Sequence, residues 1–196
     1  MSVMRRFRLR LRAFTRDEKG SMPTEGVMAF AFLIWWYIAS FQFFDAYRQK
    51  NINLKAAYTV ADLMSRETGA VDANYVEGLN TVFDYLTFSN RPTHIRVTSV
   101  YWDGNINDYR VSWSYSTSTV KTPHTDASLD EIQSRIPVLP VGDTVIVMET
   151  FMAYEPIFSI GLEAMWYDTL ITTRPRSVPC IPWDNHDGTT PACAFS

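Results

Sequence analysis

The most pronounced pattern along the chain is an apolar run that directly follows a basic segment. Residues 26–44 read GVMAFAFLIWWYIASFQFF and contain no Asp, Glu, Lys, Arg or His. As an α-helix rising about 1.5 Å per residue, this run is roughly 28 Å long, which matches the hydrocarbon thickness of a bilayer. Residues 1–20 carry seven basic and two acidic side chains, a net charge of +5 that favours the cytoplasmic side. The pattern predicts one membrane-spanning helix whose N-terminal side is cytoplasmic.

Beyond residue 44 the helical spacing continues but becomes amphipathic. Apolar side chains recur among charged ones up to about Thr68, and Gly69 then fits a helix C-cap. A second helix is predicted over residues 73–87, with Asp72 as its N-cap and Asn90-Arg91-Pro92 at its end. The spanning helix is therefore expected to continue as a long stalk. The apolar positions of this stalk are Tyr47, Ile52, Leu54, Tyr58, Ala61, Leu63 and Met64.

Residues after Pro92 have the composition of β-strands. They are rich in Val, Thr, Tyr and Trp, and the turn signal Asp103-Gly104-Asn105 predicts a β-hairpin. Trp113 and Tyr115 alternate with serines, which indicates a sheet with one apolar and one hydroxylated face. The order predicts an α+β fold, in which a long helix precedes a small antiparallel sheet with helices packed on one face. The predicted strands are His94–Trp102, Asp108–Val120, Thr144–Tyr154 and Leu170–Thr173, and a capping box at Ser128–Glu131 opens a short helix to Ile136.

The distribution of charge separates the chain into parts. The whole chain carries −3, so residues 21–196 carry −8 once the basic segment is set aside. A nucleic-acid partner is not expected, because the basic cluster is confined to residues 1–20. We expect a basic leader over residues 1–20, a transmembrane helix and stalk over residues 21–68, and one α+β domain over residues 69–196. The acidic domain should lie on the periplasmic side of the membrane.

The two cysteines, Cys180 and Cys193, lie close together in the sequence. In an oxidising compartment such a pair forms and keeps a disulfide. The loop would enclose residues 181–192 and contribute about 3 kcal/mol by the chain-entropy estimate. Two free thiols are the alternative.

A small residue stands before the apolar run rather than after it. In a secretory signal the cleavage site follows the apolar core, so the core is lost with the signal. Cleavage after Gly20 would instead remove the basic leader and keep the helix, with Ser21 as the first mature residue and Glu25 as the fifth. This order resembles the type IV prepilin signal, which is cut by a prepilin peptidase.

The same resemblance implies a role for Glu25. In pilins the matching Glu is thought to pair with the N-terminal amine of a neighbouring subunit, which here corresponds to Glu25 and the amine of Ser21. A carboxylate at the edge of hydrocarbon is costly and usually has a partner or a task. The alternative is an interfacial Glu25 that faces headgroups and water.

Three segments are similar to the TadE/TadG-like minor pseudopilins of tight-adherence (Flp) pili. The first is Arg16–Ser21 together with Glu25 and the apolar helix. The second is Val145–Pro156, which resembles a family strand that ends in an aromatic residue and a proline, and the third is Thr172–Arg176. The resemblance implies a pilin-like fold and partners among pilin and pseudopilin subunits and the inner-membrane assembly machinery.

Patterns typical of catalysis and cofactor binding are missing from the sequence. The three histidines, His94, His124 and His186, have no metal-ligand spacing, and the Gly-x-Ser-x-Gly and phosphate-loop patterns do not occur. The loop Asp184–Gly188 could bind a cation such as calcium, although a solvated turn is the simpler interpretation. We therefore expect no enzymatic activity and no cofactor.

The sequence as a whole favours a minor pseudopilin. We expect a single-pass protein of the bacterial inner membrane, processed after Gly20 and acting in pilus assembly and adhesion, either at the base or within the fibre. Its partners are the prepilin peptidase, other subunits and the lipid bilayer. The alternative from another class is an unprocessed, signal-anchored periplasmic binding or sensor domain. A third reading, a periplasmic hydrolase, would need a clustered Ser/His/Asp site in the fold.

Overall fold

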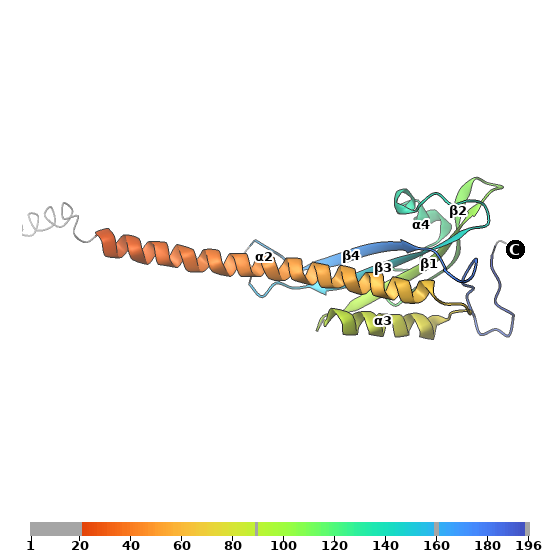
Figure 1. Ribbon diagram of the computed structural model, residues 1–196, viewed down its shortest axis with the longest axis horizontal. Helices are drawn as coiled ribbons and strands as arrows, with labels where there is room; N and C mark the ends of the chain where they lie inside the picture. The colour runs from red at the N-terminus through yellow and green to blue at the C-terminus, as the bar shows by residue number, and fades with distance from the viewer. Residues whose placement is uncertain (1–20, 89, 159–160, 195–196) are drawn as a thin grey trace, which may run out of the picture. The chain divides into compact units, whose positions relative to one another are not determined.

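The computed structural model describes residues 21–88, 90–158 and 161–194 of the 196-residue chain (Figure 1). It divides into two compact units with a boundary between Asp45 and Ala46. The predicted leader over residues 1–20, including Gly20, lies outside the described residues.

Helix α2 (Ser21–Ser65) supplies the first unit and continues into the second. Its N-terminal part is long and apolar enough to cross a membrane, which agrees with the spanning helix predicted over residues 26–44. The stalk prediction is also confirmed, but the helix ends at Ser65 rather than near Thr68, and Gly69 is not its C-cap. The reason is tertiary, because the backbone N–H of Arg176 donates to the carbonyl oxygen of Ser65 at 2.9 Å.

Helix α3 (Ala73–Thr87) has the predicted bounds. The Asp72 side chain accepts a hydrogen bond from the backbone N–H of Tyr75 at 2.8 Å, which satisfies a free donor of the first turn. The helix ends at Thr87, as predicted, and Phe88, whose φ of 50° is left-handed, is its C-cap ahead of the Asn90-Arg91-Pro92 signal. The predicted start of α3 is confirmed, and its signal, the N-cap residue Asp72, is local in the sequence.

Four antiparallel strands form one sheet in the order β2-β1-β3-β4. Strands β1 (Thr93–Asp103) and β2 (Asp108–Ser116) are the predicted hairpin, and β3 (Thr144–Tyr154) has the predicted bounds. Strand β2 stops before Val120, because the Ser118 hydroxyl accepts the N–H groups of Val120 and Lys121 and forms a turn. Strand β4 (Met165–Thr173) begins before the predicted Leu170, because it pairs with β3 along most of its length.

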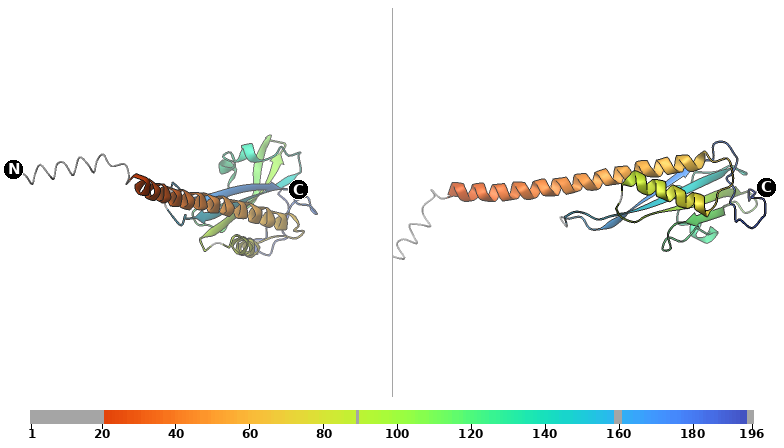
Figure 2. Two further views of the ribbon diagram at one scale, coloured as in Figure 1. Left: turned by 60° about the vertical axis from the view of Figure 1, so that its left-hand side comes forward. Right: turned by 90° about the horizontal axis from the view of Figure 1, so that it is seen from below.

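Both faces of the sheet are covered, so the expectation of helices on one face is wrong. Helix α3 and residues 46–65 of α2 lie on one face, and the short helices α4 (Asp126–Leu129) and η2 (Gln133–Arg135) lie on the other (Figures 1 and 2). Alternation along β1 places Val100 on the α4 side, and the bulge in β2, where Ser112 has no partner on β1, brings Val111 to the same side as Val100; a second core forms there. This core contains Val100, Tyr109, Leu129, Ile132, Ile136, Leu139, Val145 and Val147.

The capping box on this second face differs from the predicted one. Ser128 is the third residue of α4 rather than its N-cap, and its hydroxyl accepts the N–H of Thr125 at 2.9 Å. Asp126 fixes the earlier start, since its carboxylate accepts the N–H of Val111 at 2.7 Å and pairs with Arg110 at 2.6 Å. The contacts of Asp126 with β2 thus favour a helix that starts at Asp126 over one that starts after Ser128.

Candidate functional site

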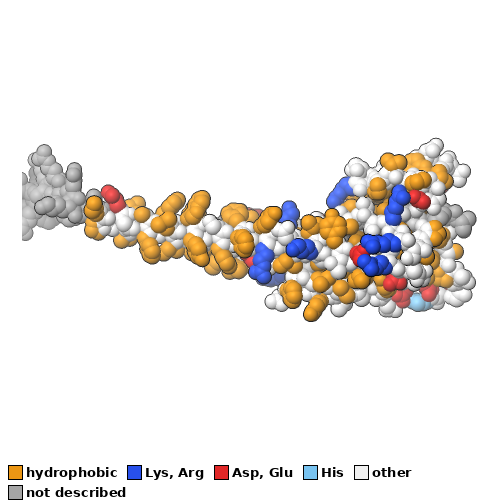
Figure 3. All heavy atoms as spheres, viewed as in Figure 1, with side chains coloured by type: hydrophobic (Ala, Val, Ile, Leu, Met, Phe, Trp, Pro, Cys, Tyr) orange, Lys and Arg blue, Asp and Glu red, His pale blue; other side chains and the backbone are white. Residues whose placement is uncertain are grey.

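The first candidate site is the apolar part of α2, most of which is exposed, although Ala39 and Gln42 are buried. Its exposed side chains are mainly aromatic and aliphatic, and Figure 3 shows those on one side of the helix. A helix that is apolar on every side is suited to lipid or to packing with other apolar helices. Phe32 and Trp36 stack one helical turn apart, with ring centroids 6.5 Å apart. The exposed residues are Val27, Met28, Phe30, Phe32, Leu33, Ile34, Trp35, Trp36, Tyr37, Phe41, Phe43 and Phe44.

The predicted first mature residue and the predicted assembly residue lie at the start of this helix, whereas Gly20 lies outside the described residues. Ser21 is the first described residue of α2, and Glu25 lies one turn later with an exposed side chain. No other Asp or Glu, and no Lys, Arg or His, follows before Asp45. Glu25 is therefore a single carboxylate at one end of an apolar helix, accessible to a group from another chain.

An exposed apolar stripe continues from the spanning part of α2 into the stalk. Tyr47 and Tyr58 are 68% and 58% exposed, although the sequence pattern counted them with the apolar face of the stalk. The residues that actually pack on the sheet are smaller: Ala56, Ala57, Val60, Ala61 and Met64. The stripe follows spacings of four and seven residues, which keep side chains on one side of a helix. Its members are Phe32, Trp36, Phe43, Tyr47, Leu54 and Tyr58.

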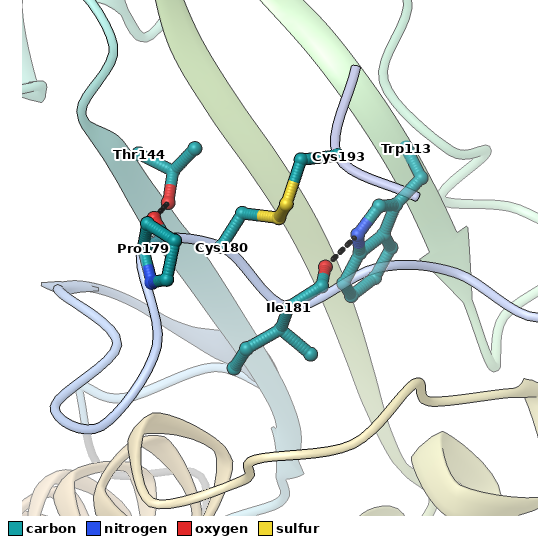
Figure 4. The surroundings of a disulfide bond; sticks show 6 residues. All are labelled: Trp113, Thr144, Pro179, Cys180, Ile181 and Cys193. Carbon is teal, nitrogen blue, oxygen red and sulfur yellow. Dashed lines mark hydrogen bonds between the residues drawn. A yellow bond between two sulfur atoms is a disulfide. The ribbon is translucent and has the colours of Figure 1, made fainter. Parts of the chain in front are cut away.

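The disulfide between Cys180 and Cys193 is present, which rejects the alternative of free thiols (Figure 4). The segment that contains Cys180 is attached to the sheet by hydrogen bonds on both sides of this residue. The indole N–H of Trp113 donates to the carbonyl oxygen of Ile181 at 2.8 Å, and the hydroxyl of Thr144 donates to that of Pro179 at 2.6 Å. The disulfide therefore closes a loop against an already anchored segment.

A buried polar cluster on the α4 side of the sheet was not predicted. Arg96 Nε and Nη2 donate to Glu149 Oε2 and Oε1 at 2.6 and 2.8 Å, and Arg96 Nη1 donates to the carbonyl oxygen of Thr122 at 2.8 Å. His124 Nε2 lies 2.9 Å from Glu149 Oε2. Burial raises the pKa of Glu149, but hydrogen bonds from His124 and Arg96 and their charges outweigh it and lower that pKa to about 2.

Ser128 completes a Ser–His–Glu arrangement, since its Oγ lies 2.9 Å from Nδ1 of His124. This is the clustering that a hydrolase would need, but its geometry favours a structural role. The Ser128 hydroxyl accepts the N–H of Thr125 and contacts its carbonyl oxygen at 3.1 Å, while Glu149 is held by Arg96 in a bidentate pair. A nucleophile needs a free lone pair directed at a substrate. The cluster instead fastens residues 122–128 to β1 and β3.

Three other features were considered as sites: the loop Asp184–Gly188, groups of possible metal ligands, and a surface hollow. His186 Nε2 contacts Asp72 at 2.9 Å, so the predicted loop Asp184–Gly188 is tied to the start of α3. Within the described residues no group of three or more His, Cys, Asp or Glu side chains could hold a metal ion. A hollow of about 270 Å³ on the α4 side is lined by His94, Ser118, Val120, Lys121, Phe151 and Trp166.

No family model, curated protein or solved structure matches this chain.

Proposed function

We propose that this chain is a membrane-anchored minor pseudopilin of the TadE/TadG-like type. A prepilin peptidase would remove residues 1–20 after Gly20, and the mature protein would act as a structural component in the assembly of a tight-adherence pilus. The helix holds it in the bacterial inner membrane with the α+β domain in the periplasm. We propose no catalytic role and no cofactor.

The observation that carries the proposal is the continuity of α2 from Ser21 to Ser65. Its first half is apolar and exposed, while its second half supplies Ala57, Val60 and Met64 to the core of the domain. Removal of everything before Ser21 would therefore leave both the anchor and the folded domain intact. A signal peptidase site placed after the apolar run would instead separate the two.

The exposed stripe on α2 suits assembly with a second helix. In lipid, helices associate by close packing and interhelical hydrogen bonds rather than by the hydrophobic effect. Ala29, Ala31 and Ser40 are small enough to permit close approach, and the exposed Glu25 can accept a charged donor from a neighbour. The disulfide at Cys180 is consistent with a periplasmic location.

Two substitutions separate processing from assembly. Gly20→Ala should block leader removal, whereas Glu25→Ala should leave cleavage largely intact and reduce surface fibres. Mass spectrometry of the mature N-terminus and electron microscopy of fibres measure the two effects. Gly26→Ala is the matched control for backbone change, since an added Cβ there would meet no atom within 4 Å. Glu131→Ala is the control for loss of an exposed carboxylate, because Glu131 lies on the α4 side of the second unit, away from α2.

The alternative function is an unprocessed, signal-anchored binding or sensor domain. The hollow beside Phe151 and Trp166 favours it, because aromatic-lined hollows suit small apolar ligands. Comparing the N-terminus in cells with and without prepilin peptidase decides between the two functions. A protein that retains Met1 in normal cells, or begins at a residue other than Ser21, would reject the pseudopilin.

A further inference from the structure

The second unit has a definite end that is nearest, along the chain, to the membrane segment. The hydroxyl of Tyr167 donates to the carbonyl oxygen of Ala46 at 3.1 Å, and Asn53 Nδ2 donates to Thr169 Oγ1 at 3.2 Å. Further along, the N–H of Arg176 reaches Ser65. Strand β4 and the second half of α2 therefore run in the same direction, with the start of β4 at the Ala46 end.

Element geometry places the start of β4 at or past the level of Ala46. From Thr169 back to Met165 a strand covers about 13 Å, at about 3.3 Å per residue. From Asn53 back to Ala46 the helix covers about 10 Å, at about 1.5 Å per residue. Met165, the first residue of β4, thus lies at least as far toward this end of the second unit as Ala46 does.

The described residues of the β3–β4 loop and its flanks include a group of exposed apolar side chains, together with the exposed carboxylates of Glu155 and Glu163. Ile157 is 65% exposed, and Phe158, Met165 and Trp166 are also exposed. The C-terminal end of α3 adds Tyr85 and Phe88, the latter 79% exposed. We name the six residues Tyr85, Phe88, Ile157, Phe158, Met165 and Trp166 the proximal surface.

Two contacts hold the α3 end and the loop at the same end of the unit. Arg91 Nη1 pairs with Glu155 Oε2 at 2.5 Å, and the N–H of Ala153 donates to the carbonyl oxygen of Pro92 at 3.2 Å. The start of β1 and the end of β3 are thereby joined beside Phe88. Residues far apart in the sequence consequently form one apolar end.

We propose that the proximal surface docks on the lipid bilayer at the level of the headgroups and the outer acyl chains. The inference rests on the membrane anchor of the proposed function. The apolar run ends at Phe44, two residues before Ala46, so the bilayer surface is within covalent reach of this end. Trp, Tyr and Phe side chains are favoured at that depth, and interfacial insertion buries apolar groups that water would otherwise solvate.

Docking on the bilayer would restrict the orientation of the second unit relative to the membrane. One covalent connection at Asp45 would leave the unit free to tilt, whereas a second contact through Ile157 and Phe158 restrains it. The opposite end, with Ile106 in the β1–β2 turn, then points away from the membrane. This arrangement would present the distal end to other periplasmic components.

The test uses the full chain in nanodiscs of phosphatidylcholine. Three single-cysteine variants carry an environment-sensitive fluorophore: Ile157→Cys on the proximal surface, Ile106→Cys at the opposite end, and Phe30→Cys in the membrane segment. Cys180 and Cys193 are disulfide-bonded and do not take the label. Lipids with a nitroxide on the upper acyl chain then quench any fluorophore within the bilayer.

We expect loss of emission for the labels at positions 157 and 30 and none at position 106. Quenching at 30 with no difference between 157 and 106 overturns the docking and leaves the anchor intact. Absence of quenching at 30 overturns the anchor itself, and with it the docking. If label 157 is shielded from water-soluble iodide but not quenched by the lipid nitroxide, the surface contacts protein instead, which also overturns the proposal.

Discussion

Replacing Glu149 by Gln tests whether the buried cluster stabilises the domain. The substitution keeps the size of the side chain but removes the charge that faces Arg96 and His124. The Arg96 side chain is only 13% exposed, so its guanidinium would remain buried without a counter-charge. Breaking a buried pair in this way is strongly destabilising, because the remaining charge has lost its compensation.

The magnitude follows from the pKa of Glu149. Folding lowers this pKa from an ordinary 4.5 to about 2, and each pKa unit corresponds to about 1.36 kcal/mol. Ionisation of Glu149 therefore contributes about 3 kcal/mol to the free energy of unfolding at neutral pH. Because the folded pKa is depressed, this contribution is complete above pH 4.5 and is lost as the pH falls toward 2.

Urea unfolding of the full chain in detergent micelles, followed by near-ultraviolet circular dichroism, measures the effect. Glu149→Gln should lower the free energy of unfolding at pH 7 by about 3 kcal/mol and flatten its dependence on pH between 4.5 and 2. Asp143→Asn is the matched control. This substitution breaks the exposed ion pair between Asp143 Oδ2 and Arg174 Nη1, which lie 3.0 Å apart. It should lower the free energy of unfolding by less than about 1 kcal/mol. Equal costs for the two variants, or an unchanged pH profile, would refute the reasoning.

Two further predictions concern the disulfide and Ser128. The double variant Cys180→Ser and Cys193→Ser should lose about 3 kcal/mol of stability, and dithiothreitol should have the same effect on the unsubstituted protein but none on the variant. A reductant without effect on the unsubstituted protein would contradict this. Ser128→Ala should lower stability by about 1 kcal/mol through lost hydrogen bonds and leave any background hydrolysis of nitrophenyl esters unchanged. An ester hydrolysis that disappears in this variant would instead support a hydrolase.

The parts of the fold that the sequence predicted are those with local causes. The spanning helix follows from an uninterrupted apolar run, α3 from the cap at Asp72, and β3 from a strand pattern between a turn and a proline. The disulfide followed from proximity in the sequence and an expected compartment. Each of these signals lies within a short continuous stretch of sequence, the longest being the apolar run over residues 26–44.

The features that were missed depend on distant partners. Arg96 and Glu149 are 53 positions apart, and no spacing rule relates them to His124. The end of α2 at Ser65 is set by Arg176, and the start of α4 is set by Val111 and Arg110. Tyr47 and Tyr58 were counted as packing residues because periodicity identifies an apolar side of a helix but not which neighbour covers it.

The contacts of the segment around Cys180 also determine which part of the fold can form last during synthesis. Trp183 bridges to Val71 in a parallel pairing, and Arg176 reaches Asp62 across 114 positions. The contacts between the α2–α3 junction and the C-terminal segment therefore cannot form until the ribosome has synthesised residues beyond 180. The apolar run of α2 precedes this point by well over a hundred residues, so it leaves the ribosome long before these contacts can form. The C-terminal segment is therefore the part of the chain that completes the second unit.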